Sequence, residues 1–380
     1  MIRFFTILFL ICITRAEAQE DSAFAVADSL VRIGNYSKAI QVYKLIENSA
    51  QAQQKIAQSY EALGKSKEAL YYYKNALGLN PDNYAGQYKY GSLLRNSGKY
   101  KEADSLFMAL DLKHPNNASV LYQLGYAKEQ LKDSMATIYY ARSYRLDNNQ
   151  QNALYRLSKL LLENGHFGAA KENIDKGLEA NPDSTRFILL NALVFFINKS
   201  YHDAVDQYDA LLALGKDTEQ IREQLAISLA QTFQYNEAIP QYKILLEHFD
   251  DKNPKWHYNL GKCYMGVNDF ENARVHINNS IELLDAPLDA QFVSLAIMYN
   301  REGNFKEVID HLQIAIKENP LNETAYYQLA VAADNYYKSK KRIIELYQNY
   351  LNLFQERGRY HELVKMRLAD LKKEAHLTKD

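Results

Sequence analysis

Small apolar residues recur along the chain at a spacing of 30 to 35 residues, almost always 33 to 35. The series runs Ala39, Ala69, Ala103, Ala136, Ala170, Ala204, Ala238, Ala273, Val308 and Ile343. We call these positions the anchors. A self-similar period of about 20–50 residues predicts an array of stacked repeats rather than a set of globular domains.

Large apolar residues accompany the anchors at fixed offsets. An aromatic residue lies three positions before most anchors, as in Tyr36, Tyr100 and Phe167. Four positions after the anchors lie Tyr43, Tyr73, Phe107, Tyr140, Ile174, Tyr208, Tyr242, Ile277, Leu312 and Tyr347. Residues three and four apart share one helix face. The pattern therefore predicts a helix whose small residue admits a close neighbour while the large residues fill the space beside it.

Glycine and proline mark the ends of these helices. Five residues before an anchor lie Gly34, Gly64, Gly98, Gly165 and Gly303, and twelve after one lie Pro81, Pro115, Pro182 and Pro320. Glycine commonly ends a helix in a left-handed conformation, and proline cannot continue one. An amphipathic segment such as Leu260-Gly261…Tyr264 precedes each glycine position. Each repeat is therefore predicted to be a helical hairpin.

A unit with Leu-Gly-x-x-Tyr in its first helix, a Gly-x-aromatic turn, Ala-x-x-x-Tyr in its second helix and a closing proline resembles the tetratricopeptide repeat family. The resemblance covers about ten units between residues 21 and 354 and is most specific from Gly64 to Pro81. It implies an all-α, right-handed α-solenoid of about ten antiparallel helix hairpins. Residues 19–250 would hold repeats 1–7, residues 251–354 repeats 8–10, and residues 355–380 a capping helix and tail.

Three local departures from the repeat pattern lead to expectations of their own. The unit around Ala136 is one residue short in its turn, and the stripe Tyr360, Leu363, Val364, Leu368 and Leu371 suits a terminal cap. Pro240 falls inside a predicted second helix. We expect a bend there and a change of pitch over residues 233–254, because an interior proline removes a helical hydrogen bond.

The N-terminus has the order of a secretory signal peptide. Arg3 precedes the apolar run from Phe4 to Ile13, and Ala16-Glu17-Ala18 offers a cleavage site before Gln19. The run is too short to span a bilayer. Residues 1–18 are therefore predicted to be removed from an exported chain that has no transmembrane helix and is periplasmic or secreted. Association with the envelope is left open, as is retention or lipidation at Cys12.

Composition and motifs argue against several classes of function. The net charge of −1, from 45 basic and 46 acidic residues, disfavours nucleic-acid binding. The sequence Gly64-Lys65-Ser66 lacks the upstream glycine of a phosphate loop, and His257 and Cys263 fall on different sides of one helix. No motif for an activated nucleophile or a metal is present. We therefore expect no enzyme activity, no cofactor and no metal.

The first helices of such a solenoid line its concave surface, which is the usual binding site. The resemblance implies which positions of each first helix face this groove. At one of these positions tyrosine recurs, in Tyr88, Tyr122, Tyr155, Tyr258 and Tyr327. Family members that bind cytosolic chaperones clamp a C-terminal carboxylate with Lys and Asn at two groove phases. Here the Lys phase reads Tyr, Leu, Glu or Val, so that activity is not expected.

Residues 187–197 are apolar all round. Packing between repeats would use Ile188, Ala192 and Phe195. The alternative is a hydrophobic binding site, or a homodimer contact, made by Leu189, Leu193, Phe196 and Ile197 with Tyr155, Leu162 and Ile227.

The function predicted first is that of an exported, non-enzymatic scaffold that binds a protein or peptide of the cell envelope in its groove. The second hypothesis is a cell-wall or glycan binder that uses the tyrosine ladder, because sugar faces stack on aromatic rings.

Overall fold

The structure is a computed structural model that describes residues 21–46, 48–284 and 287–377. The predicted signal peptide and residues 378–380 of the predicted tail lie outside these ranges. Every regular element within them is a helix, as expected. The chain divides into two compact units, residues 1–190 (unit 1) and residues 191–380 (unit 2), with the division inside one helix. The predicted division at residue 250 stays a prediction.

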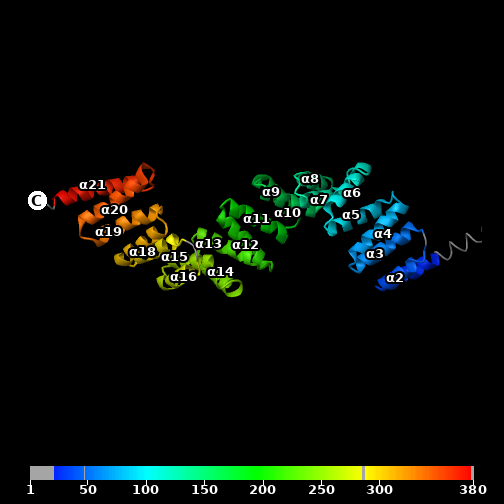
Figure 1. Cartoon of the computed structure of the whole chain (residues 1–380), viewed down its shortest axis with the longest axis horizontal. Coiled ribbons are helices and arrows are strands. Elements are labelled where there is room, and N and C mark those ends of the chain that lie inside the picture. The colour runs from blue at the N-terminus through cyan, green and yellow to red at the C-terminus, as the bar shows by residue number, and fades with distance from the viewer. Residues whose placement is uncertain (1–20, 47, 285–286, 378–380) are drawn as a thin grey trace, which may run out of the picture. The chain divides into compact units, whose positions relative to one another are not determined.

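Successive helices form hairpins within each unit (Figure 1). Residues 21–32 form the first helix of the first hairpin, and α2 is its second helix. The later first helices are α3 (Ala50–Ala62), α5 (Tyr84–Asn96), α7 (Ala118–Gln130), α9 (Gln151–Glu163), α11 (Thr185–Ile197), α13 (Glu219–Gln231), α15 (Pro254–Gly266), α17 (Asp289–Arg301) and α19 (Glu323–Tyr336). The second helices are α2 (Tyr36–Tyr43), α4 (Ser66–Leu79), α6 (Tyr100–Lys113), α8 (Ala136–Leu146), α10 (Phe167–Ala180), α12 (Tyr201–Ala213), α14 (Tyr235–His248), α16 (Phe270–Leu283), α18 (Phe305–Glu318) and α20 (Lys340–Phe354). The short helix η1 (Gln355–Arg357) leads to α21 (His361–Leu377).

The anchors and the large residues four positions after them all belong to the core. Every anchor, from Ala39 to Ile343, is at most 3% exposed, and so is every large residue four positions later. Neighbouring helices can approach closely only where a side chain is small, which is why alanine recurs at the point of contact. The predicted hairpin array is confirmed in both units.

The turns between paired helices use a left-handed residue at one position. The five predicted glycines have φ between 71° and 77°. Where glycine is missing, Lys199, Phe233 and Asn268 adopt the same conformation, with φ of 60° to 62°. The turn geometry is therefore the same without glycine, although a residue that has a Cβ is sterically strained in the left-handed region.

Tyrosines four positions after an anchor bring their hydroxyl groups to partners on a first helix. Tyr140 donates a hydrogen bond of 2.6 Å to Glu129, and Tyr73 donates one of 3.2 Å to Glu61. Burial and the nearby Glu129 carboxylate raise the pKa of the Tyr140 phenol, so this group remains a donor at ordinary pH. The ring thus packs in the core, while the hydroxyl forms a hydrogen bond between the two helices of the hairpin.

The local departures have distinct outcomes. Helix α8 starts at its anchor, Ala136, because the short turn leaves no room for an earlier first turn. Helix α14 runs from Tyr235 to His248 through Pro240, so it is already under way at the proline, and the expected bend stays a prediction. In α21, Val364, Leu368 and Leu371 are buried as predicted, but Leu363 is 57% exposed, so its place in the predicted stripe is wrong.

Glycines inside the first helices make room for the second helices, and this predicts the sign of a substitution. A Cβ on Gly125 would lie 2.7 Å from the buried Tyr140 ring, whereas one on Gly78 of α4 would meet nothing within 4 Å. We expect Gly125→Ala to destabilise the chain by about 1–2 kcal/mol, since overpacking outweighs the better helix propensity of alanine. Gly78→Ala should instead stabilise it by about 0.5–1 kcal/mol. Chemical denaturation measures both, and equal effects would contradict this account of Gly125.

Candidate functional site

The predicted groove positions all lie on first helices, and all but one are partly buried. In unit 1 they are Tyr88, Tyr122, Tyr155, Leu162 and Leu189, and in unit 2 they are Leu193, Phe196, Ile197, Ile227, Tyr258 and Tyr327. Ile197 is more open, with 46% of its surface exposed. The first helices therefore present side chains that the core does not fully enclose, as a binding surface requires.

A chain of polar contacts joins α5 to α7 in unit 1. The Gln123 amide donates a 3.0 Å hydrogen bond to the Tyr88 hydroxyl and accepts one of 2.7 Å from Arg95. Gln123 is only 6% exposed, so these bonds offset the cost of burying its amide. The network fixes the orientation of the Tyr88 hydroxyl.

Two arginines flank one tyrosine ring beside this network. The guanidinium carbons of Arg95 and Arg156 lie 4.8 Å and 4.3 Å from the centroid of Tyr126. Arg156 also pairs with Glu129 at 2.9 Å, while the polar contacts of Arg95 are with the neutral Asn96 and Gln123. Each arginine is held by an attraction to the negative face of the ring.

The five tyrosines of the predicted ladder lie on first helices, but several of their ring faces are already occupied. Arg186 lies 5.0 Å from the Tyr155 centroid and Lys262 5.2 Å from that of Tyr258. The Tyr327 ring stacks on Tyr360 at 4.1 Å with an interplanar angle of 4°. Because sugars stack on open ring faces, this arrangement disfavours the ladder as a glycan site.

Helix α11 divides its apolar side chains between core and surface. Five of its side chains are at most 6% exposed: Phe187, Ile188, Leu190, Ala192 and Val194. Of these, Ile188 and Ala192 were expected to pack between repeats, and the other three were not. Phe195 is partly buried and has a contact of its own. A Cβ on Gly177 would lie 2.5 Å from the Phe187 ring, so that glycine makes room for it. The remaining apolar positions, at 189, 193, 196 and 197, are the ones predicted for binding.

Unit 2 contains a cavity of about 510 Å³ that sequence reasoning did not locate. It is lined by Ile227, Ala230 and Gln231 of α13, Phe233 of the following turn, Tyr235 and Tyr242 of α14, Asn259, Lys262, Cys263, Met265 and Gly266 of α15, and Ser294, Ile297 and Arg301 of α17. We call it the unit-2 cavity. Three successive first helices contribute to it, so it is a part of the predicted groove. Ile227 is the predicted site residue among its lining.

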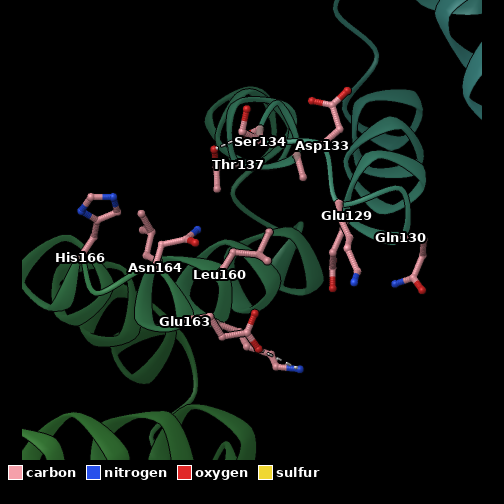
Figure 2. Close-up of a pocket in the computed structure, with 13 residues that line it drawn as sticks. Glu129, Gln130, Asp133, Ser134, Thr137, Leu160, Glu163, Asn164 and His166 are labelled. Carbon is pink, nitrogen blue, oxygen red and sulfur yellow. Dashed lines mark hydrogen bonds and ion pairs between the residues drawn. The ribbon is translucent and has the colours of Figure 1, made fainter.

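A second, more polar hollow of about 910 Å³ lies in unit 1 beside the short turn before α8 (Figure 2). Its lining includes Glu129, Asp133, Lys159, Glu163 and His166. Figure 2 shows these carboxylates on separate helices and turns, without convergence on one point. Asp133 accepts from the backbone of Met135 and pairs with Lys128 at 3.1 Å, and these contacts lower its pKa. The hollow results from the missing first turn of α8.

A histidine pair, with His257 buried and His276 partly buried, is the other feature that the sequence did not predict. The Nδ1 atoms of His257 and His276 lie 2.9 Å apart, and His257 Nε2 donates to the carbonyl of Asp251 at 3.0 Å. His257 is thus a buried histidine with both nitrogens engaged. Burial, with the neighbouring His257 and Lys243, lowers the pKa of His276 to about 4.

Metal ligands and the thiol are the remaining candidates for chemistry among the described residues. Within them, no group of three or more His, Cys, Asp and Glu side chains is arranged to hold a metal ion. Cys263 is buried, and burial raises the pKa of its thiol to about 12, so the thiolate is scarce. None of the described helices has the length and apolar character to cross a membrane.

Comparison with known proteins agrees with this architecture. Residues 60–124 and residues 155–217 match family models described as tetratricopeptide repeat. The TPR repeat-containing protein YpiA of Bacillus subtilis (strain 168) is 22% identical over 249 residues, which cover 62% of this chain and 57% of that relative. The chain therefore spans less than two thirds of the relative's length. Both matched segments are therefore tetratricopeptide repeats.

Similar solved structures include other proteins with such repeats. A tetratricopeptide repeat protein from Parabacteroides merdae is 18% identical, with a TM-score of 0.46 over 70% of this chain and 98% of that one. YrrB, described as a TPR protein with an unusual peptide-binding site, is 17% identical, with a TM-score of 0.45 over 50% of this chain and 96% of that one.

Proposed function

We propose that this chain is an exported, non-enzymatic scaffold that binds a protein or peptide of the cell envelope along the inner face of its first helices. Repeats of this kind support a protein-interaction role. The export step rests on the order of residues 1–18. Amino-terminal sequencing of the chain from the producing cells tests whether residues 1–18 are removed, since a chain that begins at Gln19 supports a cleaved signal peptide and one that begins at Met1 contradicts it.

One observation carries the proposal. The anchors and the large residues after them are buried, whereas the groove positions of the same repeats are only partly covered. The part of each groove side chain that the core leaves uncovered is available for a partner. The near-neutral charge and the covered tyrosine faces favour a protein or peptide over nucleic acid or glycan.

Leu193 and Phe196 test the groove in unit 2. Both are partly buried on α11, and the Phe196 ring meets Tyr201 edge-on at 5.7 Å. We expect the double change Leu193→Ser and Phe196→Ser to leave helicity nearly unchanged but to abolish partner capture or self-association. Losses at binding hot spots are about 2 kcal/mol or more per residue. Circular dichroism, affinity capture from envelope extracts and sedimentation measure these effects.

The matched control changes Val275 and Ile314 to serine. Both lie on second helices of unit 2, with 50% and 39% of their surfaces exposed. This control should bind as the unchanged chain does. Unfolding of unit 2 in the Leu193 and Phe196 variant would assign those residues to the core and contradict their role in binding.

A further inference from the structure

We propose that the unit-2 cavity binds a peptide segment in which large apolar side chains are flanked by carboxylates. This inference rests on the proposed function and specifies the chemistry of the partner at one place in the groove. The recognised groups are internal side chains of the peptide, so a free C-terminal carboxylate is not required.

The size and walls of the cavity suit apolar side chains. Its volume of about 510 Å³ is in the range of ligand pockets, which run from about 300 to 1,000 Å³. Ile227, Ala230 and Ile297 supply partly buried aliphatic surface, and Cys263 and Met265 form a buried floor. A phenylalanine or leucine side chain placed there would lose contact with water on most sides.

The charged residues of the lining are all basic. Lys262 and Arg301 are exposed, and no aspartate or glutamate lines the cavity. Two nearby carboxylates have partners elsewhere: Glu223 of α13 accepts from the Trp256 indole at 2.8 Å, and Glu302, which follows α17, pairs with Arg274 at 3.1 Å. Among the described residues, no ion pair involves Lys262 or Arg301. A partner with carboxylates beside its apolar side chains would complement this rim.

Arg301 is held in place by the end of the neighbouring helix. It donates a 2.8 Å hydrogen bond to the Met265 carbonyl, near the C-terminus of α15. The Met265 carbonyl also accepts from the Asn268 backbone at 3.2 Å, and the negative end of the helix dipole attracts a cation. The guanidinium is therefore positioned before any ligand arrives, while Lys262 lies over the Tyr258 ring at 5.2 Å.

Phe233 adds an aromatic edge to the cavity. It has a left-handed backbone with φ of 61°, and 77% of its surface is exposed. Its ring meets Tyr235 edge-on at 6.1 Å. A bulky residue in this conformation is strained, and its side chain gains little from the core in return. A contact with a bound apolar side chain would give this exposed ring a role.

Fluorescence anisotropy with a labelled peptide tests the proposal on the full chain. The probe is the hexapeptide Glu-Glu-Phe-Leu-Glu-Glu with its termini acetylated and amidated. Two comparison peptides carry Lys in place of Glu, or Gly-Gly in place of Phe-Leu. We expect only the probe to bind measurably, with an affinity that falls as salt is added, because exposed charges are screened.

Two variants separate the charge from the apolar wall. Lys262→Gln should weaken binding about three- to five-fold, as expected for one exposed ion pair. Ala230→Phe should fill the cavity and weaken binding about ten-fold or more, as expected for loss of a hot-spot contact. Lys317→Gln, at an exposed lysine of α18, is the matched control and should bind as the unchanged chain does.

The outcomes distinguish this inference from the proposed function. Equal binding of the lysine-flanked peptide, equal binding by Lys262→Gln, or no binding of the probe would overturn the inference. If envelope capture still depends on Leu193 and Phe196 in any of those cases, the groove function stands and only the chemistry assigned to the unit-2 cavity fails. Circular dichroism of Ala230→Phe confirms that it folds, and Lys262→Gln decides the result if it does not.

Discussion

Replacing Tyr140 by alanine is expected to destabilise unit 1 by about 3–5 kcal/mol, as for other large buried aromatic residues. The Tyr140 side chain is fully buried, packs against Gly125 and lies 5.9 Å from the Tyr122 ring. Its hydroxyl also donates to Glu129, which would keep only Arg156 as a partner. Hydrogen exchange of the amides in α7 and α8 measures the effect locally, and these amides should lose most of their protection.

Two further variants in the same hairpin serve as comparisons for Tyr140→Ala. Tyr140→Phe removes only the hydroxyl and should cost about 1.5 kcal/mol or more, because the bond is to a carboxylate. Ile138→Ala, at a residue 49% exposed on the same helix, should change stability by no more than about 0.5 kcal/mol. If Tyr140→Ala and Ile138→Ala had similar effects, the large residue after the anchor would not be a core residue.

The histidine pair predicts a loss of stability in mild acid. The folded-state pKa of His276 is about 4, below its ordinary 6.5, because burial, His257 and Lys243 disfavour the charged ring. The ring that stacks on His276, at a centroid distance of 5.7 Å, belongs to Tyr264, which carries no negative charge that would stabilise a protonated histidine. The neutral His276 ring therefore contributes fully to the stability of the folded state above pH 6.5, and this contribution is lost as the pH falls toward 4. At pH 5 the loss should be about 2 kcal/mol.

Denaturation at pH 7.5 and at pH 5 measures this loss, with His276→Gln as the reference. The unchanged chain should lose about 2 kcal/mol more than His276→Gln between the two pH values. Carboxylates that titrate in both proteins cancel in this comparison. An equal loss in the two proteins would show that His276 is not the group responsible.

The sequence predicted the repeats well because one physical requirement recurs in each of them. Two helices can approach only at a small residue, so the anchors stand out, and left-handed turns favour glycine, so Gly64 and Gly98 mark the turns. Phe233 shows the limit of this reasoning. The hairpin packing holds the turn in a left-handed conformation even where the residue itself disfavours it.

The unpredicted parts of the site depend on how two helices lie along each other. His257 and His276 are on α15 and α16, and their Nδ1 atoms meet only at the axial register these helices adopt. The unit-2 cavity likewise needs three first helices in place at once. In α21, Leu363 is exposed beside the buried Val364, so the buried stripe is narrower than the sequence pattern predicted.

Site-specific photo-crosslinking in the producing cells tests most directly whether the inner face of the first helices binds the partner. Benzoylphenylalanine would replace Leu193 or Tyr258 on first helices, and Val275 or Ile314 on second helices. We predict that both inner positions form an adduct with the same envelope protein and that neither outer position does. Adducts at the outer positions alone, or equal adducts at all four, would contradict the account.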